Sequence, residues 1–149
     1  MSDSFPVLRS VVLDTTDPRG LAEFYRQLLG YRYRVGDQPP AAGAPDPRGA
    51  SWLVLLDPPG HSRLCFQGVD QLPPSTWPDN DVPQQLHLDL SVPSADELTA
   101  QRDRALALGA RQLHDRFDHP EEPLYVFADP AGHPFCIYVS HPGAPEQSV

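Results

Sequence analysis

The sequence contains no lysine, since all 11 basic residues are arginine. Chemistry that requires lysine, namely Schiff-base catalysis, pyridoxal binding and the P-loop, is therefore excluded. Acidic residues number 20, which gives a formal net charge of −9. Residues 1–75 hold seven arginines and eight acids, a net −1, whereas residues 76–149 hold four arginines and twelve acids, a net −8. This balance argues against binding to nucleic acid or to an anionic membrane, which requires a basic surface.

Cysteine is scarce and long apolar runs are missing. The two cysteines, Cys65 and Cys136, both lie in segments of alternating polarity, and we expect reduced thiols in a cytoplasmic protein. No apolar run approaches the roughly 20 residues of a membrane-spanning helix. Because no basic region followed by an apolar one opens the sequence, we also expect no signal peptide. The length of 149 residues and the hydrophobic content of 40% fit one globular domain.

The order of predicted elements repeats along the chain. Helix signals occur twice, with an N-cap at Asp17 before a proline, a capping box beginning at Ser94, and helix stops at Gly30 and Gly109. Segments of alternating polarity between turn residues predict strands. The first half therefore predicts strands at 7–13, 31–35, 52–56 and 63–69 around the first helix, and the second half predicts strands at 85–92, 110–117, 123–128 and 134–140 around the second.

The two halves also match in sequence, which indicates an internal duplication. The caps Asp17 and Ser94 are 77 residues apart, and the turns at 57–61 and 129–133 share four of five residues. We therefore predict an α+β fold of tandem βαβββ modules in a single domain spanning residues 1–149. Module 1 covers about 7–69, a proline-rich linker covers 70–84, and module 2 covers about 85–140.

Several motifs in both modules resemble those of the vicinal oxygen chelate superfamily. This superfamily contains glyoxalase I, bleomycin-resistance proteins, fosfomycin-resistance enzymes and extradiol dioxygenases, and the resemblance is closest to its glyoxalase-like branch. It covers residues 7–140 and implies curved mixed sheets around a cleft, with the helices outside. The motifs are Asp17-Pro18-x-x-Leu21-Ala22-x-Phe24-Tyr25, Leu28-Leu29-Gly30-Tyr31, His87-Leu88-Asp89-Leu90, Leu108-Gly109-Ala110 and Asp129-Pro130-x-Gly132-His133-x-Phe135-Cys136.

Each predicted strand has one apolar face and one mixed, polar face. In the strand at 85–92, for example, His87 and Asp89 share the polar face, opposite Leu88 and Leu90. Two interpretations are open. The polar faces are either solvated, as on many antiparallel sheets, or they line the cleft that the resemblance implies.

Metal-binding members of the superfamily place His or Gln on the first strand, Glu on the fourth, His on the fifth and Glu on the eighth. The resemblance puts these positions at Ser10, Cys65, His87 and Cys136. A gapless match of the two turns would use Leu64, but the alternation puts Cys65 on the polar face. Because the carboxylates that suit nickel, iron or manganese are missing, we expect no resident metal and neither glyoxalase I nor dioxygenase activity. The alternative is zinc held by Cys65, His87 and Cys136.

Polar side chains would then hold a ligand. His87 is the candidate catalytic residue, as a general base or an orienting donor, unless it makes only a structural hydrogen bond. Arg63 suits a carboxylate or phosphate, unless it pairs with Asp14 or Asp89.

Aromatic side chains are the other candidates. Trp77, in the linker, either caps the cleft or anchors its own loop, and Tyr138 either stacks on a ligand or packs in the core. The predicted ligand-binding residues are Arg63, Gln67, Asp89, Trp77 and Tyr138.

We accordingly predict a cytoplasmic, metal-independent, glyoxalase-like protein that binds a small molecule, forms a homodimer, and binds neither nucleic acid nor membrane. Two alternatives remain: an isomerase or lyase that uses His87, with or without zinc, and an antibiotic-sequestering resistance protein. A deep aromatic groove at a dimer interface favours sequestration, whereas a closed polar pocket with a displaced His87 pKa favours an enzyme.

Overall fold

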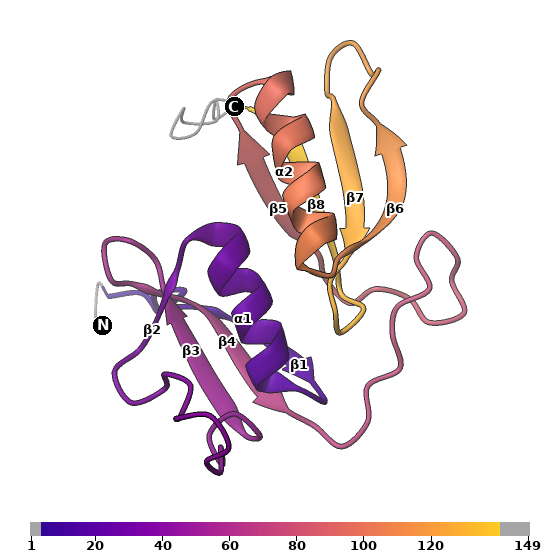
Figure 1. Ribbon diagram of the computed structural model, residues 1–149. Helices are drawn as coiled ribbons and strands as arrows, with labels where there is room; N and C mark the ends of the chain where they lie inside the picture. Colours follow the sequence, from indigo (N-terminus) through magenta and orange to yellow (C-terminus); the bar gives the residue numbers. More distant parts are fainter. Residues whose placement is uncertain (1–3, 141–149) are drawn as a thin grey trace. The chain divides into compact units, whose positions relative to one another are not determined.

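The computed structural model describes residues 4–140, and the chain divides into two compact units with the boundary between Leu72 and Pro73. Within this range each unit holds one helix and four strands in the same order (Figure 1). The first unit runs β1 (Val11–Thr15), α1 (Pro18–Leu29), β2 (Arg32–Tyr33), β3 (Trp52–Leu56) and β4 (Ser62–Gly68). The second runs β5 (Leu88–Val92), α2 (Ala95–Leu108), β6 (Arg111–Arg116), β7 (Leu124–Ala128) and β8 (Pro134–Val139).

The two sheets have the same topology, which confirms the tandem βαβββ modules. Their strand orders are β1-β4-β3-β2 and β5-β8-β7-β6. In each sheet the first and last strands of the module pair in parallel and the other neighbours pair antiparallel, so both sheets are mixed. Each helix packs on one face of its own sheet (Figure 1), which leaves the other face for polar side chains. Neither helix in the part described is long and apolar enough to cross a membrane.

The helix ends follow from the capping residues. The Asp17 carboxylate accepts a hydrogen bond from the Gly20 N–H at 3.0 Å, and α1 ends where Gly30 adopts a left-handed conformation with φ of 69°. The Ser94 hydroxyl accepts from the Glu97 N–H at 3.2 Å and begins α2. Both helices therefore lie where the sequence predicts them.

The core of each unit lies between its helix and its sheet. Apolar side chains at every second strand position face the helix, as the alternation predicts. The burial of these side chains, at about 25 cal/mol per Å² of apolar surface, holds the helix to the sheet. Fully buried side chains in the first unit include Leu13, Leu21, Tyr25, Leu53, Leu55 and Phe66, and in the second they include Leu98, Phe127, Phe135 and Ile137.

Two strands begin three or more residues later than the sequence predicts. β1 begins at Val11 instead of residue 7, and residues 4–9 are exposed. β5 begins at Leu88 instead of residue 85. Its partner β8 begins at Pro134, which has no N–H with which to extend the ladder. The predictions of strand at 7–10 and at 85–87 are therefore wrong.

A one-residue bulge distinguishes the two modules. In the first, Leu55 pairs with Leu64 and Leu56 pairs with Ser62, so Arg63 is an extra residue in β4. The second module pairs its equivalent residues without an interruption, up to Ala128 with Pro134. The extra residue explains why the gapless match to Leu64 is wrong and why Cys65 is the equivalent of Cys136.

The parallel pairs place the other equivalent positions. Val12 pairs with Cys65 in the first sheet, and Asp89 pairs with Cys136 in the second. Ser10 lies two residues before Val12 and His87 two residues before Asp89, each directly preceding the first strand of its module. These positions are equivalent between the modules, as the superfamily resemblance implies.

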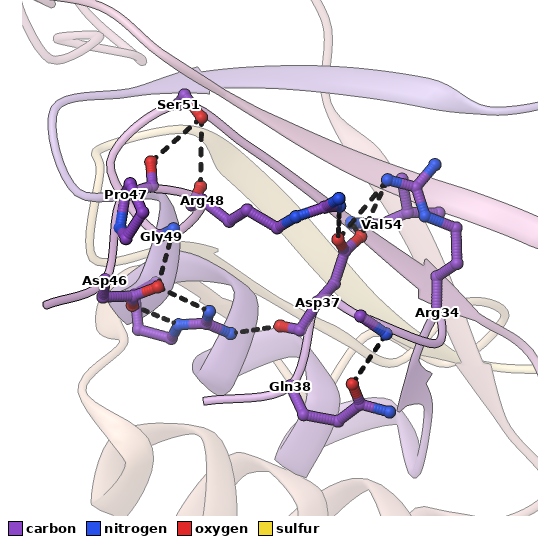
Figure 2. Close-up of polar contacts among 11 residues, drawn as sticks. Arg34, Asp37, Gln38, Asp46, Pro47, Arg48, Gly49, Ser51 and Val54 are labelled. Atoms are coloured by element: carbon purple, nitrogen blue, oxygen red, sulfur yellow. Dashed lines mark hydrogen bonds and ion pairs between the residues drawn. The ribbon is translucent and has the colours of Figure 1, made fainter. Parts of the chain in front are cut away.

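A buried carboxylate organises the long loop between β2 and β3 (Figure 2). Asp37 has no exposed surface. It accepts hydrogen bonds from Arg48 Nη1 at 2.6 Å and from the Val54 N–H at 3.1 Å, and lies 3.0 Å from Arg34 Nη2. The loop lacks periodic sequence, yet it is fixed to β3 by one side chain.

A second pair of charged residues joins the same loop to α1 (Figure 2). Arg19 donates to both Asp46 carboxylate oxygens, at 2.8 and 3.0 Å, and to the Asp37 carbonyl at 2.7 Å. Its guanidinium carbon lies 4.9 Å from the centroid of the Tyr33 ring. The hydrogen bonds from Arg19 lower the pKa of Asp46 below its usual value, so this pair stays charged well into the acidic range.

Candidate functional site

A pocket of about 560 Å³ lies on the polar face of the second sheet. Its volume falls within the range of small-molecule sites. Side chains from all four strands, from the loop between β6 and β7, and from the segment before β5 line it. They are Trp77, Gln84, His87, Asp89, His114, Arg116, Glu122, Leu124, Val126, Pro134, Cys136 and Tyr138.

The strand register sets the order of these side chains across the pocket floor. Paired residues on neighbouring strands point to the same face of a sheet, so each row of pairs crosses the floor from β5 to β6. The first row is Asp89, Cys136, Val126 and His114, and the second is Ser91, Tyr138, Leu124 and Arg116.

A second bulge turns the end of β6 toward the pocket. Gln112 pairs with Phe127 and accepts a hydrogen bond from Arg102 of α2 at 2.9 Å, so it faces the helix. The register then shifts, and His114 pairs with Val126 on the opposite face. Simple alternation would have put Gln112 and His114 on one face, and the bulge separates them.

His87, Asp89 and Cys136 form a polar cluster at the β5 side of the pocket. His87 Nε2 lies 3.3 Å from Asp89 Oδ1, and the Cys136 thiol donates a hydrogen bond to the same oxygen at 2.8 Å. The His87 and Asp89 side chains are about half exposed, at 51% and 57%. A carboxylate on Nε2 orients the imidazole and leaves Nδ1 for a ligand.

The thiol in this group is a poor metal ligand and a poor nucleophile. Burial, together with the hydrogen bond to Asp89 and the Asp89 charge, raises the pKa of Cys136 to about 12. The Glu122 carboxylate acts in the same direction. Because the thiolate is the reactive and metal-binding form, Cys136 stays protonated and inert near neutral pH.

Two aromatic side chains complete the pocket. Trp77 lies edge-to-face with the His114 ring, with a centroid distance of 6.4 Å. Both Trp77 and Tyr138 are partly exposed and line the pocket. Neither is a fully buried core residue.

Arg63 and Gln67 lie on β4 of the first unit and are not among the residues that line this pocket. Arg63 Nε donates to Asp57 Oδ2 at 2.8 Å, so its partner is the carboxylate of the preceding turn. Within the first unit Arg63 therefore pairs with Asp57 and not with Asp14, one of the two partners weighed from the sequence. Arg63 also lowers the pKa of Asp57. The Arg63 guanidinium was expected to bind a carboxylate or phosphate of a ligand, and here it binds the Asp57 carboxylate instead.

The residues at the superfamily's metal positions do not fit its metals. In the first unit the Cys65 thiol lies 3.5 Å from Ser10 Oγ, to which it donates, and in the second the Cys136 thiol donates to Asp89. Across residues 4–140, no group of three or more His, Cys, Asp or Glu side chains is arranged to hold a metal ion. Sulfur ligands and a neutral hydroxyl are unsuited to hard ions such as Mn²⁺.

Two mixed four-stranded sheets, each formed by a βαβββ module with its helix on one face, define the glyoxalase/bleomycin-resistance fold. The glyoxalase-like domain family matches residues 10–138, and the chain belongs to this family within the vicinal oxygen chelate superfamily. A comparison with curated proteins finds no match.

Solved structures with this fold are similar in shape and distant in sequence. A glyoxalase/bleomycin resistance protein/dioxygenase family enzyme from Burkholderia phytofirmans PsJN has a TM-score of 0.63 at 15% identity, covering 88% of this chain and 96% of that one. A related domain from Frankia sp. EAN1pec has 0.62 at 19%, covering 95% and 96%. A mutant of the fosfomycin resistance protein FosX from Listeria monocytogenes, complexed with Mn(II) and 1S,2S-dihydroxypropylphosphonic acid, has 0.64 at 17%, covering 93% and 95%. These similarities show the fold.

The sequence interpretation missed several pocket residues. It named none of His114, Arg116, Glu122 and Gln84 as ligand contacts, although all four line the pocket. His114 was missed because the bulge in β6 changes the face to which it points, and the sequence carries no signal for that bulge. His87, Asp89, Trp77 and Tyr138 do lie together, as the sequence predicts.

Proposed function

We propose that the protein is a metal-independent, glyoxalase-like binding protein that holds a small molecule in the pocket of its second module. The observation that carries the proposal is the polar cluster of His87, Asp89 and Cys136 on the floor of a pocket of about 560 Å³. Convergent polar groups within apolar walls are typical of small-molecule sites. The ligand is held by hydrogen bonds and apolar contacts.

The metal-independent part of the proposal rests on the donor atoms. Elemental analysis of the purified protein should find far less than one metal ion per chain, because two thiols must lose protons before they bind zinc. One zinc per chain, lost in the Cys65→Ser/Cys136→Ser double variant, would overturn metal independence.

The binding part is tested with a fragment library and ligand-observed NMR on the full chain. Hits should weaken about tenfold in His87→Ala, the size of a lost hydrogen bond to a polar group. They should persist in His61→Ala, since His61 lies in the turn between β3 and β4 of the first unit. Circular dichroism confirms that both variants fold. A library without hits, or hits that His87→Ala leaves unchanged, contradicts the proposal.

A second candidate function is an enzyme that uses His87 as a general base. The 3.3 Å contact between His87 Nε2 and Asp89 favours it, because an imidazole oriented by a carboxylate is a common proton acceptor in catalysis. Turnover of a bound fragment whose kcat, measured at saturating fragment, falls in Asp89→Asn would select the enzyme. A third candidate, antibiotic sequestration, is selected by tight binding of an antibiotic with no change in its structure.

A further inference from the structure

We propose that the ligand of the second-module pocket is bipolar, with a cationic or hydrogen-bond-donating group at one end, an anionic group at the other and an apolar middle. The inference rests on the proposed function, because it specifies the ligand chemistry of that same pocket. It follows from the order in which the sheet arranges charged and apolar side chains.

The charged side chains of the pocket floor lie at its two edges. Asp89 is on β5, whereas His114 and Arg116 are on β6, and β8 and β7 lie between these strands. Three strand spacings separate the edges by about 14 Å of backbone. The side chains between them are mainly apolar, namely Cys136, Tyr138, Leu124 and Val126.

The acidic edge retains an acceptor for a ligand. Asp89 Oδ1 is engaged by the Cys136 thiol and approached by His87. Within residues 4–140 the other oxygen, Oδ2, accepts no hydrogen bond, and the side chain is 57% exposed. This oxygen suits an ammonium or amide donor.

The basic edge retains donors. The Arg116 guanidinium forms no ion pair with any carboxylate of the described chain. Beside it, the His114 ring is held edge-on by Trp77. The planar fork of an arginine matches a carboxylate or phosphate in two hydrogen bonds, which suits this edge to an anion.

The net charge of the pocket selects a ligand with both charges. Glu122, from the loop between β6 and β7, adds a second carboxylate, so the two carboxylates and the Arg116 guanidinium sum to a net −1. A purely anionic ligand is repelled by this net charge and by the net charge of −9 on the whole chain. A purely cationic ligand covers Arg116 without pairing it, which is costly. A bipolar ligand satisfies both edges.

The test compares three probes by isothermal titration calorimetry on the full chain at neutral pH and low salt. The bipolar probe is para-(aminobutyl)benzoate, and its single-charge analogues are phenylbutylamine and para-butylbenzoate. We expect the bipolar probe to bind about tenfold tighter than either analogue, because each charge-assisted hydrogen bond contributes about that factor.

Two conservative variants assign the ends. Arg116→Gln should weaken the bipolar probe and para-butylbenzoate about tenfold and leave phenylbutylamine unchanged. Asp89→Asn should weaken the bipolar probe and phenylbutylamine about tenfold and leave para-butylbenzoate unchanged. Matched controls are Arg111→Gln, on the same strand, and Asp103→Asn, on α2. Neither control residue lines the pocket, so all three affinities should persist.

The outcomes separate this inference from the proposed function. An analogue that binds as tightly as the bipolar probe, equal weakening of all probes by Arg116→Gln, or no binding of any probe at millimolar concentration overturns the bipolar ligand. In each of these cases, fragment hits that His87→Ala weakens still support a ligand pocket. The absence of such hits overturns the proposed function as well.

Discussion

The two cysteines occupy equivalent strand positions but have different neighbours. Cys65 is buried and donates to the Ser10 hydroxyl, whereas Cys136 lies partly exposed in a pocket and donates to a carboxylate. The two thiols therefore differ in the group that accepts their hydrogen bond, which is a neutral hydroxyl just before β1 for Cys65 and a carboxylate on β5 for Cys136. At Cys136 a negative charge 2.8 Å away opposes formation of the thiolate.

Alkylation by iodoacetamide tests this effect. Because the pKa of Cys136 is raised to about 12, its protonated form prevails at pH 8.5, and the rate should rise only as the pH approaches that value. Against a free thiol of pKa near 8.5, Cys136 should react slower by about a hundredfold or more at pH 8.5. Asp89→Asn removes the charge and should accelerate the reaction. The Cys65→Ser background isolates the signal, and a rate at pH 8.5 like that of a free thiol would contradict the interpretation.

At the scale of elements, the loop between β2 and β3 depends on Asp37. Asp37→Ala leaves the Val54 N–H and two guanidinium groups without their shared acceptor. The partners Arg34 and Arg48 are about half exposed and regain water, so we expect a loss of about 2–4 kcal/mol in the free energy of unfolding. Urea denaturation should show a lower midpoint with an unchanged slope. Asp70→Ala, in the exposed linker, should have no such effect. An Asp37→Ala variant as stable as Asp70→Ala would refute this role.

The bulge in β4 offers a second test of an element. The second module forms the same turn without an extra residue, with matching hydrogen bonds from Asp57 N–H to the His61 carbonyl and from Asp129 N–H to the His133 carbonyl, both at 2.9 Å. Deletion of Arg63 should therefore be tolerated. It removes the ion pair between the half-exposed Arg63 and the buried Asp57 carboxylate, which keeps its hydrogen bonds from the Gly60 and His61 N–H groups. The deletion should therefore cost about 1–2 kcal/mol in thermal or urea unfolding.

A deletion one position later is the control for Arg63. Leu64 is 5% exposed and packs in the core, so its deletion should cost about 2–5 kcal/mol, as for loss of a buried leucine side chain. Equal destabilisation by the two deletions would show that the bulge is required for the strand register.

The sequence predicts the elements better than it predicts the site. Caps and glycine stops are local signals, and they locate both helices. The alternation of polar and apolar residues around the start of β5 is also a local signal, and it locates His87 and Asp89. Arg116 and His114 depend instead on a bulge that pairing with β7 creates, and the partner of Arg63 depends on how a turn folds back. Such contacts arise between segments, and no single-segment pattern encodes them.

The loop between β2 and β3 shows the same limit. Its proline and glycine content correctly predicts the absence of regular structure. The three arginines that contact Asp37 come from positions 19, 34 and 48. No periodic pattern relates these positions, so the sequence gives no sign that the loop is fixed.

At the scale of the whole molecule, we predict a homodimer. Two four-stranded sheets leave edge strands, and edges are commonly covered by another chain. Large apolar side chains are also exposed in the first unit, with Phe5, Val7 and Leu8 each more than 80% exposed. The second half carries a net −8, so repulsion disfavours contact between two second modules and favours an interface that includes the first. A stable dimer buries about 800 Å² per partner, and we expect Phe5 and Leu8 to supply apolar area to it. Phe5→Ser/Leu8→Ser should therefore shift the equilibrium toward monomer in sedimentation at micromolar concentration. A wild-type species of 16.5 kDa alone would refute the dimer.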